Sequence, residues 1–191
     1  MDAVEKAYLK ELLESLDMFL KPGNNGYNLI CDINTNTVFA RVGDGRFRIP
    51  DEVPEEIRYP LQEMIQCAYD FSRQFESAEE MARYGVEGYR RIGEYCSTVL
   101  AAKLLQSGSM EYAVWSYGAG RESVVNGDYF SHLEAAKKRF LIRSGAIPQG
   151  HVILAGEQLK TVHNLDDMTQ EEIDKLALAE HAPEMDEEIE Q

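Results

Sequence analysis

Asp32, Asn34 and Asn36 have residue types and spacing that could do chemistry, because alternating oxygen side chains of this kind begin the calcium loop of an EF-hand. Two later positions do not fit that loop. Thr37 stands where the loop needs glycine for a sharp turn, and Gly43 stands where a glutamate would supply two oxygens. The pattern therefore argues against an EF-hand calcium site.

The other groups with catalytic potential lack the spacing that a reaction requires. The stretches GVEGYRRIG and SYGAGRES contain neither GxxxxGK[ST] nor a GxGxxG that follows a strand. Adjacent carboxylates such as Glu55 and Glu56 stand at helix starts, where the helix dipole explains them. The histidines show no HExxH or i, i+4 pairing, and none adjoins a cysteine: His132, His151, His163 and His181. The sequence therefore predicts a non-enzymatic protein with no cofactor and no bound metal.

The chain has three cysteines, Cys31, Cys67 and Cys96. Their number is odd, their spacing is wide, and no CxxC pair or neighbouring histidine completes a zinc site. Free cysteine is among the most buried residue types. We therefore expect three reduced thiols that pack as small apolar residues.

The densest basic cluster lies in residues 137–143 of a protein whose formal net charge is −15. Cations in the later turns of a helix interact favourably with the negative end of the helix dipole, which would make the cluster structural. Binding of a phosphate or an acidic group is the alternative. Both interpretations stay open for the four residues Lys137, Lys138, Arg139 and Arg143.

Negative charge is concentrated in the C-terminal residues 151–191, which hold 12 acidic and 2 basic residues, whereas residues 1–108 hold 18 and 12. A solubilising tail is one explanation. The other is that acidic side chains compete for a positively charged nucleic-acid channel in a partner. Under this hypothesis the partner-binding residues are the basic cluster together with nine acidic residues. These acidic residues are Asp166, Asp167, Glu171, Glu172, Asp174, Glu184, Asp186, Glu187 and Glu188.

The overall acidity also restricts the class of partner. Affinity for free duplex DNA depends on cations that displace counterions from the phosphates, so we expect no direct binding to duplex DNA and a basic protein as partner. No apolar run approaches the roughly 18 residues of a membrane span, and MDAVEKAYLKELLESLDMFL is amphipathic rather than a signal peptide. We therefore expect a cytoplasmic protein with no membrane contact.

Hydrophobic spacing predicts the elements that position these residues. A helical pattern covers residues 2–20, and KPGNNG ends it. YNLICDI, TVFARV and RFRIP are strand-like and separated by turns, which indicates an antiparallel meander. Pro54 begins a helix that runs to about residue 74. Ser77 with Glu80 has the capping-box pattern of a further helix through YRRIGEYCSTVLAAKLL.

A second module follows QSGS. MEYAVWSY and ESVVNGDYF are strand-like and joined by GAGR, and Ser131 with Glu134 forms a capping box for a helix with Gly145 at its end. This order predicts a ββα unit. The expected class is α+β, with helices packed on small antiparallel sheets and an acidic tail. The expected divisions are residues 1–108, 109–150 and 151–191.

Residues 111–148 combine an aromatic strand, a glycine turn, a G-x-Y-F step and an EAAK-x-x-F-x-x-R-S-G helix. This succession resembles a small module of proteins encoded on conjugative elements and prophages of gut Firmicutes. The size and acidity of the chain are similar to those of type II-A anti-CRISPR proteins from these bacteria. The residues that match the module are Trp115, Gly127, Tyr129, Phe130, Glu134, Ala135, Ala136, Lys137, Phe140, Arg143, Ser144 and Gly145. The resemblance implies that the protein inhibits a host defence system.

Acidity and resemblance together predict a non-enzymatic binding protein that inhibits a nucleic-acid-directed host nuclease. Cas9 is the favoured partner because it holds its nucleic acids in strongly positive channels, and a restriction enzyme comes next. The alternative is an accessory or scaffolding protein of a conjugative element or prophage that has no inhibitory role.

Overall fold

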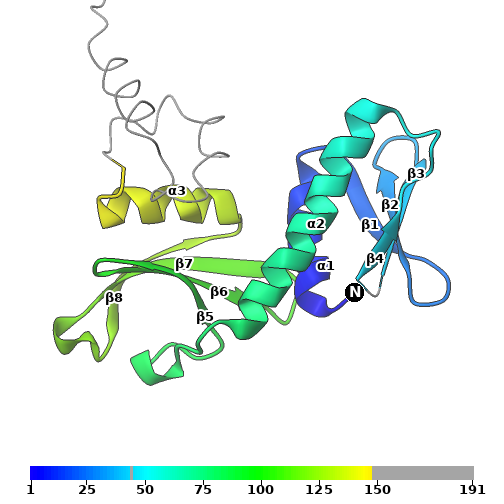
Figure 1. Ribbon diagram of the computed structural model, residues 1–191. Helices are drawn as coiled ribbons and strands as arrows, with labels where there is room; N and C mark the ends of the chain where they lie inside the picture. Colours follow the sequence, from blue (N-terminus) through cyan, green and yellow to red (C-terminus); the bar gives the residue numbers. More distant parts are fainter. Residues whose placement is uncertain (44, 148–191) are drawn as a thin grey trace, which may run out of the picture. The chain divides into compact units, whose positions relative to one another are not determined.

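The computed structural model describes residues 1–43 and 45–147, so Asp44 and residues 148–191 lie outside the described part. The described residues belong to one compact unit. They form helices and two separate four-stranded antiparallel sheets, β1-β2-β3-β4 and β5-β6-β7-β8 (Figure 1). This arrangement confirms the predicted α+β class.

Helix α1 spans Ala3–Glu14 and begins with a capping box. The Asp2 carboxylate accepts from the Glu5 amide at 2.7 Å, and the Glu5 carboxylate accepts from the Asp2 amide at 2.9 Å. The predicted helix over 2–20 is too long. The chain turns at Asp17, which has a left-handed φ of 52°, and Met18–Pro22 continues as strand β1.

The first sheet contains the predicted meander. Strands β2 (Asn28–Asp32), β3 (Val38–Gly43) and β4 (Arg46–Arg48) follow β1 in antiparallel order. One face of this sheet is closed to solvent, since Ile30, Ala40 and Val42 have no exposed surface and belong to the main core. The opposite face carries Arg41, Arg46 and Arg48.

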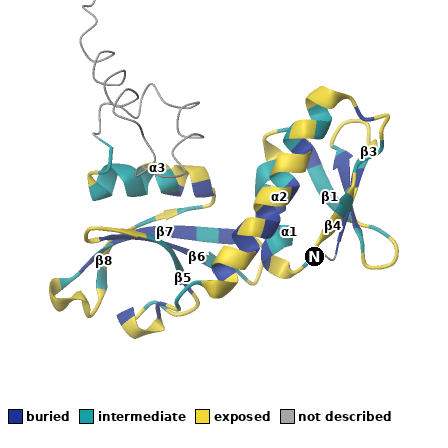
Figure 2. Ribbon diagram, in the orientation of Figure 1, coloured by how far each residue is buried: buried dark blue, intermediate teal, exposed yellow. Residues whose placement is uncertain are grey.

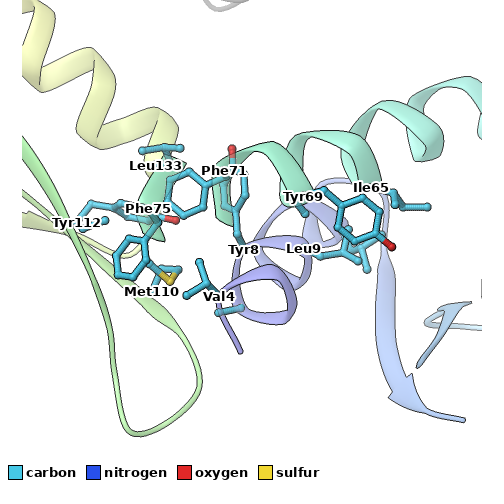
Figure 3. Close-up of a cluster of buried hydrophobic side chains, with 14 of the residues drawn as sticks. Val4, Tyr8, Leu9, Ile65, Tyr69, Phe71, Phe75, Met110, Tyr112 and Leu133 are labelled. Carbon is cyan, nitrogen blue, oxygen red and sulfur yellow. The ribbon is translucent and has the colours of Figure 1, made fainter. Parts of the chain in front are cut away.

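Helix α2 spans Glu55–Ser77, and Pro54 is its N-cap residue, close to the predicted start. Buried and exposed residues alternate along it as an amphipathic helix requires (Figure 2). The buried side packs against α1, and the ring centroids of Phe71 and Tyr8 lie 4.3 Å apart. Figure 3 shows this core, in which Leu9 and Ile65 have no exposed surface.

The predicted helix after residue 77 is wrong. This region contains the short 3-10 helix η1 (Ala82–Tyr84) and the strands β5 (Arg90–Tyr95) and β6 (Thr98–Leu104). Gly85 and Gly88 adopt left-handed φ values of 82° and 77°, which end the helical path. Ser77 is the last residue of α2, and its hydroxyl donates to the carbonyl of Gln74, so it opens no new helix.

The second sheet continues through β7 (Met110–Tyr117) and β8 (Val124–Phe130), which are separated by the 3-10 helix η2 (Ala119–Arg121). Helix α3 (Leu133–Ser144) packs on β6 and β7, and with β7 and β8 it forms the predicted ββα unit. Gly145 ends α3 with a φ of 76°, as predicted. Residues 108 and 109, where we expected a domain division, lie in the loop between the paired strands β6 and β7.

The predicted capping box at Ser131 is wrong, because His132 is the N-cap residue of α3 and makes no side-chain cap bond. The cap comes from α1 instead. One carboxylate oxygen of Glu11 accepts from the Leu133 amide and the other accepts from the Tyr112 hydroxyl, each at 2.6 Å. Burial raises the pKa of Glu11, and the two hydrogen bonds oppose that shift. Glu11 therefore joins α1 to both β7 and α3.

Candidate functional site

Three arginines share the solvent face of the first sheet. Arg41 on β3 lies directly opposite Arg48 on β4 in the antiparallel ladder, and Arg46 precedes Arg48 by two residues. Because side chains alternate between the faces of a strand, all three point to the same side. The intervening pair, Val42 and Phe47, belongs to the opposite side and packs in or against the core. We call the surface formed by Arg41, Arg46 and Arg48 the arginine face.

The three side chains of the arginine face are exposed, and no carboxylate of the described residues forms an ion pair with them. Arg58 donates to the carbonyls of Asp51 and Val53. Each remaining arginine of the described part pairs with a carboxylate: Arg73, Arg83, Arg90, Arg91, Arg121, Arg139 and Arg143.

Placing Arg41 directly opposite Arg48 has an energetic consequence. Like charges that face each other across an antiparallel pair destabilise the sheet. The stability of the first sheet therefore does not explain why both positions are arginine.

Two adjoining hollows open beside the arginine face, and Arg41 and Arg48 line both. The larger has a volume of about 400 Å³ and extends along residues 49–52, where Asp51 and Glu52 add negative charge. The smaller has a volume of about 190 Å³ and also reaches Arg46. The surface therefore offers guanidinium groups beside shaped, partly apolar recesses.

Cations already cover the aromatic rings of this side of the sheet. The Arg41 guanidinium lies 4.9 Å from the ring centroid of Tyr27, and a Cβ atom at Gly43 would lie 3.0 Å from the same ring. The Lys21 ammonium lies 6.0 Å from the ring centroid of Phe19. These contacts hold Arg41 and Lys21 in place by cation–π attraction, and the Tyr27 and Phe19 side chains are only partly exposed.

The predicted basic cluster has mainly internal partners. Asp128 on β8 accepts from Arg139 at 2.6 Å and lies 3.4 Å from Arg143. Lys137 pairs with Glu134 one turn earlier at 3.0 Å. The structure therefore uses much of this cluster to fasten α3 to β8. Lys138, the remaining residue of the cluster, is exposed and has no ion pair with a described residue.

The predicted acidic set lies in residues 151–191, outside the part of the chain that the structure describes. Its members are Asp166, Asp167, Glu171, Glu172, Asp174, Glu184, Asp186, Glu187 and Glu188.

The DINTNT stretch is a hydrogen-bonded turn. The Asp32 carboxylate accepts from the amides of Asn34 and Thr35 at 2.9 and 2.6 Å, and these bonds lower the pKa of Asp32. Such a turn explains this carboxylate by local structure. Within residues 1–43 and 45–147 no group of three histidine, cysteine, aspartate or glutamate side chains could hold a metal ion.

The cysteines differ in exposure. All three are free thiols, but only Cys31 is buried, so the prediction of burial is wrong for Cys67 and Cys96. Partial burial and the neighbouring carboxylates of Asp70 and Glu63 raise the pKa of Cys67. A raised pKa reduces the thiolate fraction and therefore the reactivity of this side chain.

The sequence contained a signal for the arginine face that charge counting missed. The run RFR on a predicted strand places Arg46 and Arg48 on one face, and an antiparallel hairpin through GDG places Arg41 opposite Arg48. The density of charge along the chain favoured residues 137–143, because four cations lie close together there in the sequence. Pairing the predicted strands before counting would have brought the three arginines together.

No family model, curated protein or solved structure matches the chain. The resemblance of residues 111–148 to mobile-element proteins therefore stays a prediction. Among the helices of the described residues, none is long and apolar enough to cross a membrane.

Proposed function

We propose that the chain is a non-catalytic binding protein that holds a negatively charged partner on the arginine face. The observation that carries this proposal is that three exposed arginines share one sheet face without a carboxylate partner among the described residues. Arginine binds carboxylate and phosphate oxygens through paired hydrogen bonds. Anions of a partner would therefore relieve the repulsion between Arg41 and Arg48.

Comparative capture from host lysate tests this proposal. Tagged wild-type protein is compared with the double variant Arg41→Ala/Arg48→Ala and with the control Arg73→Ala. Arg73 suits the control because its side chain is 72% exposed and pairs with Asp70 on its own helix. We expect a protein that wild type and control retain and the double variant loses. The same retained proteins for all three would contradict the proposal.

Inhibition of a nucleic-acid-directed nuclease is the second candidate, and a different observation favours it. The formal net charge of −15 suits competition for a positively charged channel, as in Cas9 or a restriction enzyme. This role would require a cytoplasmic protein. Under it, residues 151–191 supply most of the negative charge that the basic partner would meet.

A cleavage assay with guide-loaded Cas9 tests the second candidate. Added protein should suppress cleavage of target DNA while guide and DNA stay intact. Unchanged cleavage at saturating protein would favour an accessory or scaffolding role instead. The variant Arg41→Ala/Arg48→Ala adds a further distinction, because inhibition should survive in it if the acidic residues are responsible and disappear if the arginine face is responsible.

A further inference from the structure

We infer that the partner of the arginine face is an acidic segment of another protein, bound in an extended conformation. The inference rests on the proposed binding function and names the chemistry of the partner. Three features of the surface carry it: the spacing of the arginines, the covered aromatic rings and the composition of the larger hollow.

The spacing of the arginines matches an extended acidic peptide. Arg46 and Arg48 are two residues apart on β4, which corresponds to about 6.8 Å in a strand. An extended partner with carboxylates at positions i and i+2 presents them on one face with the same repeat. Arg41, directly opposite Arg48, adds a second guanidinium for one of these carboxylates.

The aromatic rings do not form a platform for nucleic-acid bases. Proteins that bind single strands stack the bases on open aromatic side chains. The Tyr27 ring lies against Gly43 and beneath the Arg41 guanidinium, and Lys21 lies over Phe19. A strand of nucleic acid would therefore gain phosphate contacts but little stacking.

The larger hollow has the composition of a protein interface. Apolar groups of Val38, Ile49 and Pro50 line it beside Arg48, and Val38 is 41% exposed. Arginine beside apolar side chains is typical of surfaces that bind proteins, whereas nucleic-acid interfaces are much more positively charged. Asp51 and Glu52 repel phosphates and carboxylates alike, so the acidic side chains of the peptide would face the arginines, and its backbone amides or lysine groups could donate to these two acceptors.

Fluorescence anisotropy with defined probes tests the inference on the full chain. The probes are a labelled peptide of alternating glutamate and valine, the matching peptide with glutamine, and a short oligothymidine. We expect binding of the glutamate peptide alone. Arg48→Ala should weaken this binding by about tenfold or more, the loss of one charge-assisted hydrogen bond. Arg48→Lys should also weaken it because paired hydrogen bonding is lost, and Arg73→Ala should bind as wild type does.

The outcomes separate the inference from the proposed function. Preferential binding of oligothymidine that Arg48→Ala abolishes would overturn the acidic protein partner and leave the arginine face as a binding surface. Failure of wild type to bind the glutamate peptide would also overturn the inference, while selective loss of a lysate partner in the double variant would still support the proposed function. Far-ultraviolet circular dichroism of each variant checks that the fold is intact.

Discussion

Replacement of Glu11 tests how α1 is joined to the second sheet. Its carboxylate accepts from the Tyr112 hydroxyl and the Leu133 amide, and Tyr112 has no exposed surface. Glu11→Ala leaves both donors without this acceptor, and each such loss costs about 1–3 kcal/mol. We therefore expect the free energy of unfolding to fall by about 2–5 kcal/mol, a large part of the roughly 5–15 kcal/mol of a typical domain.

Urea unfolding followed by the fluorescence of the single tryptophan measures this change, because Trp115 is only 2% exposed in the folded protein. Glu11→Gln keeps a carbonyl acceptor for Leu133 and an amide that can donate to the Tyr112 hydroxyl, so it should cost about 1 kcal/mol. Glu14→Ala, at an exposed position of the same helix, should change the free energy of unfolding by less than about 0.5 kcal/mol. Equal losses for Glu11→Ala and Glu11→Gln would refute the reasoning.

The pH dependence of the same comparison provides a second test. Burial raises the pKa of Glu11 above its ordinary value of 4.5, so the folded state binds this proton more tightly than the unfolded state. The stabilisation from protonated Glu11 is therefore fully present below the unfolded pKa and is lost as the pH rises through the folded pKa. Relative to Glu11→Gln, wild type should lose stability over this interval and reach a constant difference above it. A difference independent of pH would contradict the burial described for this carboxyl group.

The other predictions concern packing, thiols and surface charge. Gly127→Ala should cost about 1–3 kcal/mol in urea unfolding, because the new Cβ would lie 2.4 Å from the tryptophan indole nitrogen; Gly93→Ala, with its nearest contact at 3.5 Å, is the control and should cost less. In Ellman's assay Cys31 should react only after unfolding, and Cys67 should react more slowly than an unperturbed thiol near pH 8 because its pKa is raised. Equal rates for native and unfolded protein would contradict this. Lys138→Ala should change the free energy of unfolding by at most about 1 kcal/mol, and a larger loss would reveal a structural role for this exposed cation.

The elements that could be predicted from the sequence are those fixed by local chemistry. Pro54 directly precedes α2 as its N-cap residue, Gly145 ends α3, and turn residues separate the short strands of the first sheet. The hairpin of β5 and β6 was wrongly predicted as a helix, because β6 lies inside the sheet and Thr98–Ala102 is buried throughout. A strand buried on both faces is a continuous apolar run, and its alanine and leucine residues also favour a helix.

Features that depend on distant parts of the chain could not be read from local patterns. The acceptor for the first amide of α3 is Glu11, and the hydrogen bond spans 122 positions in the sequence. Ser131 offered a plausible local cap, but the tertiary contact replaces it. The arginine face depends in the same way on strand register, because only pairing brings Arg41 opposite Arg48.

The bond between Glu11 and Leu133 also affects the order in which the protein is assembled. Ribosomes synthesise α1 long before α3, so Glu11 stays hydrated until the strands of the second sheet have been made. Contacts between residues so far apart form late, since the intervening chain must first be ordered. Helix α3 consequently gains its starting cap only when α1 has docked. Undocking of α1 would open α3 as well, and the two helices should lose hydrogen-exchange protection together.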